Sequence, residues 1–266
     1  MQHLMTTPDA HDQNLATDQS QPGLRQELSD HKFIEWSRST FEDSYDVIQL
    51  ARHIRESGKP SLTGLDIGGG IGLFAASVAD ICPDQDVQIT VVDPGLEASR
   101  QRIENPSVNF ELASFDNYTT EQKFDFVSFR LVLHHLIGQN EADTLQVQAK
   151  ALAKARDMLK DDGFLLIVEN FYEPMVGTDF TSRLIYEVAS SKTIESVTRR
   201  LGANTAGEGV RFHSPETWQQ FYDEAGVEVV SEEIHPWWGV DMPIWQKLPL
   251  LCRHRFQAAQ ILKRKS

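Results

Sequence analysis

The chain has 266 residues, of which 40% are hydrophobic and 24% charged, and its formal net charge is −14. This composition is typical of a soluble globular chain with one sizeable domain, and the acidic balance argues against nucleic-acid binding, which depends on Lys and Arg at the phosphates. The chain has no apolar run of membrane-spanning length, no secretory signal pattern and only two cysteines, so we expect a cytoplasmic protein without disulfides, zinc or membrane contact.

Two segments of different character come first. Residues 1–23 are polar and lack apolar periodicity, which predicts a disordered leader. Residues 24–58 carry apolar side chains at helical spacing, and Gly58 and Pro60 end the pattern, which predicts an N-terminal helical lid.

Strands and helices then alternate from residue 59 to residue 170. The predicted strands cover 62–67, 87–93, 108–112, 124–129 and 164–169, and the predicted helices cover 71–81, 96–103 and 144–159. Such alternation predicts an α/β fold, a doubly wound, Rossmann-like parallel sheet with helices on both of its faces.

The rhythm breaks in the last third of the chain. Residues 171–212 have apolar and aromatic positions but no strand pattern, which predicts a helical insert that caps the substrate side of the site. Ser214 and Gly226 are expected to cap a helix that begins at Pro215. Strands are expected at 227–234 and 253–262, so that residues 213–266 complete the core sheet.

The most informative stretch is the glycine-rich corner at 65–74, LDIGGGIGLF. A short strand ends at Asp66, an apolar helix begins at Leu73, and glycines stand between them at Gly68, Gly69, Gly70 and Gly72. Glycine permits a tight turn and lets a ligand approach the backbone, and the helix start adds unpaired N–H groups. A dinucleotide fingerprint would need glycine where Leu73 stands. The carboxylate of Asp66 suits a cationic or hydroxyl-rich ligand better than a pyrophosphate.

This corner resembles the first motif of the class I S-adenosylmethionine-dependent methyltransferases. The stretch FDFVSFRLVLHHL at 124–136 is similar to the motif of their fourth strand. The resemblance covers residues 60–170 well and 213–264 by topology. It implies a seven-stranded, mostly parallel sheet with an antiparallel last strand, S-adenosyl-L-methionine as cofactor, and in-line methyl transfer to a small-molecule acceptor through an oxygen, nitrogen or carbon nucleophile.

The resemblance also implies which residues bind the cofactor. The glycine corner would cradle it, and Asp93 would accept hydrogen bonds from the ribose hydroxyls. Arg130 would either pair with the cofactor carboxylate or contact the cofactor amino group through its backbone carbonyl. Ser114 stands where the family often has an aspartate that reaches the adenine. Phe115 would then stack on the adenine ring, unless it only packs the loop. The full predicted set is Asp66, Gly68, Gly69, Gly70, Gly72, Asp93, Pro94, Ser114, Phe115, Asp116 and Arg130.

The candidate catalytic residues are His134, His135 and Tyr172, with Glu169 in reserve as a base. Histidine titrates near neutral pH and suits proton removal from an acceptor. Adjacent histidines on a helix do not face one point, so at most one of the pair is catalytic. No metal ligand set is expected. Two alternatives remain open: transfer of another group or a rearrangement with the same cofactor, and an NAD-dependent oxidoreductase, which would also use Asp93.

Overall fold

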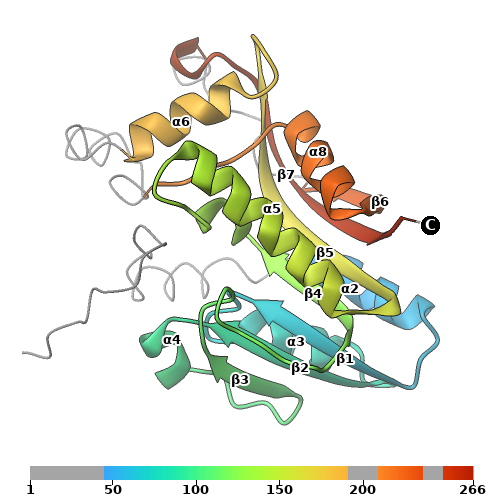
Figure 1. The fold of residues 1–266 in the computed structure, drawn as a ribbon. Helices are drawn as coiled ribbons and strands as arrows, with labels where there is room; N and C mark the ends of the chain where they lie inside the picture. Colours follow the sequence, from blue (N-terminus) through green and yellow to red (C-terminus); the bar gives the residue numbers. More distant parts are fainter. Residues whose placement is uncertain (1–44, 191–208, 236–247, 266) are drawn as a thin grey trace, which may run out of the picture.

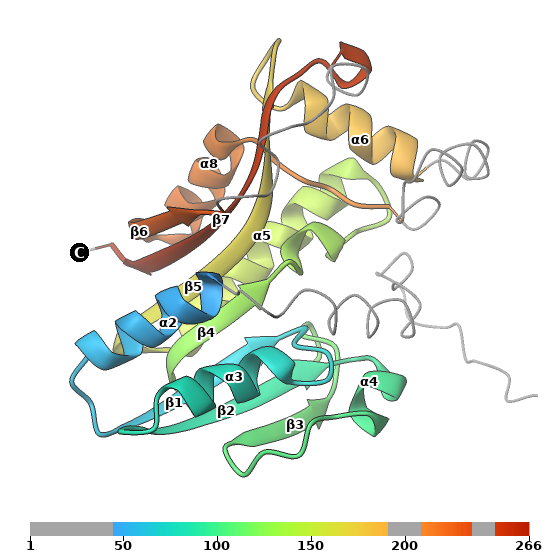
Figure 2. The same ribbon diagram turned by 180° about the vertical axis from the view of Figure 1, so that it is seen from behind.

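The computed structural model describes residues 45–190, 209–235 and 248–265. They form one seven-stranded sheet in the order β3-β2-β1-β4-β5-β7-β6, with helices on both faces (Figures 1 and 2). The strands are β1 (Ser61–Ile67), β2 (Asp86–Asp93), β3 (Val108–Leu112), β4 (Phe124–Arg130), β5 (Leu159–Pro174), β6 (Val227–Ile234) and β7 (Cys252–Arg264). Strands β1 to β5 are parallel, and β7 is antiparallel to both β5 and β6. The predicted Rossmann-like sheet with an antiparallel last strand is therefore confirmed.

Six helices and a short 3-10 turn connect these strands within the described residues. They are α2 (Tyr45–Glu56), α3 (Leu73–Ile81), α4 (Leu96–Arg100), η1 (Leu133–His135), α5 (Glu141–Met158), α6 (Phe180–Ser190) and α8 (Pro215–Ala225). Apolar side chains of α2 and α3 share one core with one face of the sheet, and those of α5 and α8 share another core with the opposite face. None of these helices combines the length and apolar character that crossing a bilayer requires.

The central strands are buried on both sides. In β4 every side chain from Phe124 to Phe129 is buried, which is expected when helices cover both faces of a parallel sheet. In β5, Leu165 and Ile167 belong to the core under α5 and α8, whereas Leu166 and Val168 belong to the core under α2 and α3. These covered strands fix where each loop leaves the sheet.

Several boundaries differ from the prediction. Strand β5 continues to Pro174, so residues 171–174 belong to the sheet and not to the expected insert; this extension pairs with β7 from Cys252 onward. Helix α4 ends at Arg100, and the N–H of Ile103 donates to the carbonyl of Ile71. The predicted leader and most of the predicted lid lie outside the described residues, as do residues 191–208 of the insert.

The predicted caps of α8 are confirmed. The Ser214 hydroxyl accepts the N–H of Thr217 at 3.2 Å, and Gly226 ends the helix in a left-handed conformation with φ of 69°. This local chemistry fixes where α8 begins, and therefore where the segment before it must run.

The buried carboxylate of Asp125 links several residues at the edge of the sheet where the parallel strands begin. Asp125, in β4, accepts hydrogen bonds from Lys59 at 2.7 Å, from Lys160 at 2.7 Å and from the Thr63 N–H at 2.8 Å. Burial alone would raise the pKa of Asp125, but the two lysines and the Thr63 N–H lower it to about 2. The group therefore stabilises the folded state in its ionised form.

The low pKa of Asp125 gives a stability prediction with a definite sign. Since the folded-state pKa lies below the ordinary value of 3.8, this stabilisation is complete above that value and is lost as the pH falls to about 2. We expect Asp125→Asn to lower the free energy of unfolding by about 2 kcal/mol at pH 7, and by about half as much at pH 3. Urea unfolding at the two pH values measures both differences, and equal losses would contradict the ionic origin.

Candidate functional site

The glycine corner joins β1 to α3 at the edge where the parallel strands end. Gly68, Gly70 and Gly72 have positive φ angles of 67°, 57° and 80°. A Cβ added to Gly68 would lie 2.6 Å from the Val132 side chain, and one added to Gly72 would lie 2.5 Å from the Phe110 ring. A side chain at any of these positions would strain the backbone, and one at Gly68 or Gly72 would also force its neighbour to shift.

Asp66 lies fully buried beneath the corner. One oxygen, Oδ1, accepts the Ser128 hydroxyl at 2.7 Å, whereas Oδ2 has no hydrogen-bond partner among the described residues. A Cβ on Gly69 would lie 2.2 Å from that oxygen. Burial raises the pKa of Asp66 to about 7, and the Ser128 hydrogen bond only partly offsets it. An unpartnered buried oxygen beside an open backbone cradle fits a site that binds a polar ligand.

Asp93, the last residue of β2, forms a hydrogen bond with the glycine corner. Its Oδ2 accepts the N–H of Gly70 at 2.8 Å, and its Oδ1 accepts the N–H of Gly95, across Pro94, at 2.8 Å. Both carboxylate oxygens of Asp93 are therefore directed at the glycine corner and at the turn that follows β2. The predicted ribose contact is compatible with this placement and stays a prediction.

The residues after β3 form a turn that packs against the core. The Phe115 ring is buried, packs edge-on against the Phe129 ring at 5.6 Å between centroids, and has the Lys154 ammonium 4.7 Å above it. Phe115 thus packs in the core, as in the alternative in which it only packs the loop, and its stacking on adenine stays a prediction. The Ser114 carbonyl accepts two backbone N–H groups of the following turn, and Asp116 is exposed.

Arg130, at the end of β4, is held by the chain itself. Its Nε donates to Asp46 Oδ2 at 2.5 Å, and the guanidinium lies 5.8 Å from the Phe74 ring centroid. Asp46 is buried near the start of α2. The guanidinium predicted to meet a cofactor carboxylate therefore already pairs with a protein carboxylate, which joins α2 to the site.

His134 has a buried carboxylate partner. Its Nδ1 lies 2.7 Å from Glu169 Oε2, and its backbone N–H donates to Glu169 Oε1 at 3.3 Å. In a neutral imidazole whose proton sits on Nδ1 and points at Glu169, Nε2 keeps its lone pair. No other group in residues 45–190, 209–235 and 248–265 hydrogen-bonds Nε2. Such an imidazole can accept a proton, with the carboxylate stabilising the resulting charge.

The backbone that presents His134 is strained. Leu131, the first residue after β4, has a φ of 57° although it is not glycine. Its N–H donates to the Val168 carbonyl at 2.8 Å, and the N–H of His135 donates to the Val132 carbonyl at 2.9 Å. A left-handed leucine costs on the order of 1 kcal/mol or more and persists only where its surroundings fix it, as commonly happens at functional sites.

The other two predicted catalytic residues have less suitable surroundings. The His135 ring lies 4.2 Å from the His134 ring, and burial together with that neighbour lowers its pKa well below the usual value. Burial raises the pKa of Tyr172, with Arg255 opposing it in part. A raised phenol pKa disfavours the phenolate that a tyrosine base requires.

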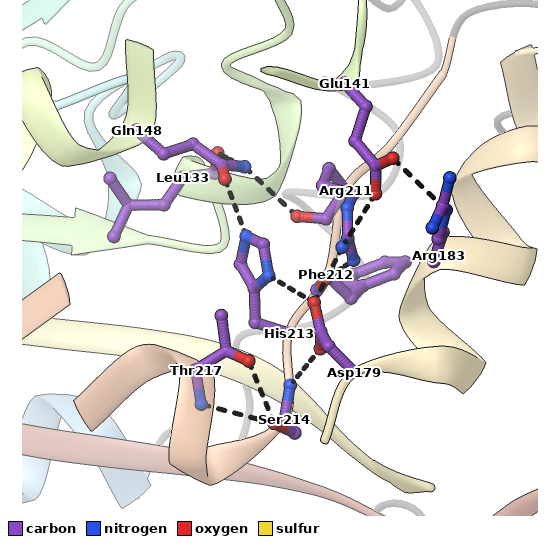
Figure 3. A network of polar contacts seen from close by, with 10 residues as sticks. All are labelled: Leu133, Glu141, Gln148, Asp179, Arg183, Arg211, Phe212, His213, Ser214 and Thr217. Carbon is purple, nitrogen blue, oxygen red and sulfur yellow. Dashed lines mark hydrogen bonds and ion pairs between the residues drawn. The ribbon is translucent and has the colours of Figure 1, made fainter. Parts of the chain in front are cut away.

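A second polar network lies beside the His134 turn (Figure 3), and the sequence interpretation missed it. Its central members are Gln148, Asp179, Arg211 and His213, of which Gln148 and His213 are fully buried. One signal was readable: Gln148 interrupts the apolar stripe of α5, between Leu145 and Leu152. In the part of the chain that the structure describes, no three His, Cys, Asp or Glu residues are grouped so as to hold a metal ion.

Comparison with solved structures finds the same fold in several enzymes. A Haloferax volcanii putative methyltransferase, in complex with the Trm112 activator, matches with a TM-score of 0.59 at 12% identity, covering 90% of this chain and 98% of that one. A Leishmania major S-adenosylmethionine-dependent methyltransferase matches with a TM-score of 0.54 at 15% identity, covering 86% and 77%. A Burkholderia thailandensis 1,6-didemethyltoxoflavin-N1-methyltransferase, bound to 1,6-didemethyltoxoflavin and S-adenosylhomocysteine, matches with a TM-score of 0.52 at 14% identity, covering 90% and 88%.

Another match is to a longer protein described as a pericyclic reaction enzyme, of which this chain covers 44%. At these identities the likenesses establish the fold alone. A search of curated proteins found no match. The family evidence comes from a sequence model described as a methyltransferase domain, which matches residues 34–232. Since that match spans most of the chain and includes both the glycine corner and the His134 turn, the chain belongs to the class I S-adenosylmethionine-dependent methyltransferases.

Proposed function

We propose that this chain transfers a methyl group from S-adenosylmethionine to a hydroxyl or amine of a small molecule, with His134 as the general base. The observation that carries the proposal is the buried contact between His134 Nδ1 and Glu169 at 2.7 Å. His134 follows β4, and Glu169 lies one residue beyond the last β5 position paired with β4. Both therefore stand at the edge where β1 and β2 end, which is where parallel sheets bind ligands.

The residues of the corner fit the cofactor. The positive-φ glycines leave the backbone open, the Asp93 carboxylate lies next to Gly70, and Asp66 has an oxygen without a hydrogen-bond partner among the described residues beneath Gly69. When bound, the cofactor supplies a methyl group activated by its sulfonium.

In the proposed mechanism, His134 accepts the acceptor's proton at Nε2. Glu169 holds Nδ1–H and stabilises the imidazolium that forms, as in other carboxylate-oriented histidine bases. Methyl transfer is an in-line displacement, so holding the nucleophile in line with the methyl carbon and the sulfur supplies much of the rate. The chain needs no covalent intermediate for this step.

Two observations support a small-molecule acceptor. The net charge of −14 disfavours a nucleic acid. The Burkholderia structure of the same fold is a methyltransferase bound to 1,6-didemethyltoxoflavin. The NAD-dependent alternative has lost its support, because the matched family uses S-adenosylmethionine. A rearrangement remains the competing reaction, because the same fold occurs in a pericyclic reaction enzyme.

Two measurements on the purified full chain test the proposal. Calorimetry compares S-adenosylhomocysteine with NADH, and we expect only the former to bind. Cofactor carrying a labelled methyl group is then incubated with a panel of phenols, carboxylic acids and amines, and labelled products are identified by mass spectrometry. Binding of NADH alone would overturn the cofactor assignment. Conversion of a panel member without incorporation of the label would favour a rearrangement.

A further inference from the structure

A single extended segment, residues 209–214, lies against the His134 turn. The N–H of Arg211 donates to the His134 carbonyl at 2.9 Å, and the Phe212 ring stacks on the His134 ring at 4.5 Å between centroids and 29° between planes. On the far side, the N–H of Tyr172 donates to the His213 carbonyl at 3.2 Å. The segment thus contacts His134 through both its backbone and a ring face.

Gln148 of α5 ties this segment to the turn. Its Nε2 donates to the Leu133 carbonyl at 2.9 Å and to the Arg211 carbonyl at 3.1 Å. Two carbonyl acceptors fix the orientation of the amide, because only the NH₂ group donates. The amide oxygen, Oε1, therefore faces His213 Nε2, which lies 2.7 Å away (Figure 3). Because an amide oxygen only accepts hydrogen bonds, His213 Nε2 is the donor of this contact.

The other ring nitrogen of His213 contacts Asp179. Nδ1 lies 3.0 Å from Asp179 Oδ2, and that oxygen also accepts a hydrogen bond from Arg211 at 2.7 Å. The second oxygen of Asp179 accepts the N–H of Ser214 at 2.8 Å. Asp179 follows β5, so the network joins the start of the insert, the segment before α8 and α5 (Figure 3).

The imidazole of His213 cannot replace His134 as a base. Its side chain is fully buried, and both of its ring nitrogens are engaged by protein acceptors. The network fixes the position of Phe212, because hydrogen bonds hold both of its neighbours in the chain, Arg211 and His213. Moving the Phe212 backbone away from His134 therefore requires breaking one of these buried hydrogen bonds of its two neighbours.

We propose that Gln148 and His213 are positioning residues for His134. By joining the Leu133 carbonyl to the 211–213 segment, they hold the Phe212 ring against His134 and keep its Nδ1 on Glu169. This proposal rests on the proposed function only in taking His134 to be the base; the geometric claim is testable without an acceptor.

The test compares Gln148→Leu with the matched control Gln85→Leu. Gln85 also donates from Nε2 to two backbone carbonyls, those of Ile54 and Lys59, both at 2.9 Å, but at the opposite edge of the sheet. In ¹⁵N-histidine-labelled protein, the Nδ1-bound proton of His134 is assigned by its loss in His134→Gln. We expect the exchange of this proton with solvent to accelerate about tenfold or more in Gln148→Leu, because the variant loses the free energy of at least one buried hydrogen bond. In Gln85→Leu the exchange rate should stay within about twofold of the wild-type rate.

Unchanged exchange in folded Gln148→Leu, or equal acceleration in both variants, overturns the proposal. Should Gln148→Leu fail to fold, His213→Asn replaces it, since asparagine retains a donor toward Asp179 but not toward Gln148, and the same expectation applies. S-adenosylhomocysteine affinity is measured in parallel and is expected to be unchanged in each variant. Failure of the wild-type chain to bind it would refute the proposed function, while the exchange rates would still decide the positioning role.

Discussion

Replacing His134 by glutamine is expected to lower kcat for methyl transfer about 10²- to 10⁴-fold, the usual contribution of a general base. The side chain is buried, and its Nδ1 already holds Glu169 at 2.7 Å, so the base is preorganised and its loss has no nearby substitute. S-adenosylhomocysteine affinity should remain within a few fold, because in the proposed mechanism His134 acts on the acceptor and not on the cofactor. Single-turnover rates with a labelled methyl group measure the first quantity and calorimetry the second.

Acceptors of different acidity distinguish two roles for His134, removal of the acceptor's proton and support of the fold. An acceptor that is already ionised needs no base, so the loss in His134→Gln should shrink as more acidic phenols are used. Glu169→Gln should show the same trend with a smaller loss, because an amide still orients the ring but no longer stabilises the imidazolium. His135→Gln should cost less than about tenfold. A loss in His134→Gln that is independent of acceptor acidity would contradict the assignment.

Local chemistry made part of this molecule predictable. The ends of β1 at Ile67 and of β2 at Asp93, the glycine turn between Ile67 and Leu73 and the caps at Ser214 and Gly226 all depend on residues close in sequence. Helix capping and left-handed glycines act over one turn of chain, so a pattern of a few residues identifies them.

The missed features depend on contacts between distant residues. Strand β5 runs to Pro174 only because β7 pairs with it about 80 residues later, and no local pattern in 171–174 signals that partner. Glu169 lies in β5 and His134 in η1, the turn after β4, and the sequence identified both residues without indicating that they touch. The burial of Phe115 against Phe129 is likewise a tertiary contact.

The buried network around His213 was invisible for the same reason. Asp179 and His213 lie 34 positions apart, and Gln148 and His213 lie 65 apart. Only the polar residue within the apolar stripe of α5 gave a local sign. A buried amide requires hydrogen-bond partners, so such an interruption predicts that a polar group lies opposite, although the sequence does not say which one.

The glycine corner leads to the second large effect, in cofactor binding. Gly68→Ala places a Cβ 2.6 Å from Val132 on a backbone with φ of 67°. Val132 begins the turn that presents His134, so the added methyl group pushes apart two loops that meet at the ligand edge. We expect S-adenosylhomocysteine to bind at least about 100-fold more weakly, for a distortion costing about 3 kcal/mol in the bound state.

Gly58→Ala is the matched control, because it separates backbone strain from the collision. Gly58 has a nearly equal φ of 65°, yet a Cβ there meets nothing within 4 Å, and it lies between α2 and β1, away from the corner. Both variants should lose about 1 kcal/mol of unfolding free energy from the left-handed alanine, while only Gly68→Ala should lose affinity for S-adenosylhomocysteine. The affinities of the two variants are measured by calorimetry on folded protein. Equal affinities would show that S-adenosylhomocysteine binding does not depend on the close approach of the glycine corner to the turn at Val132. The corner would then not be the cofactor site.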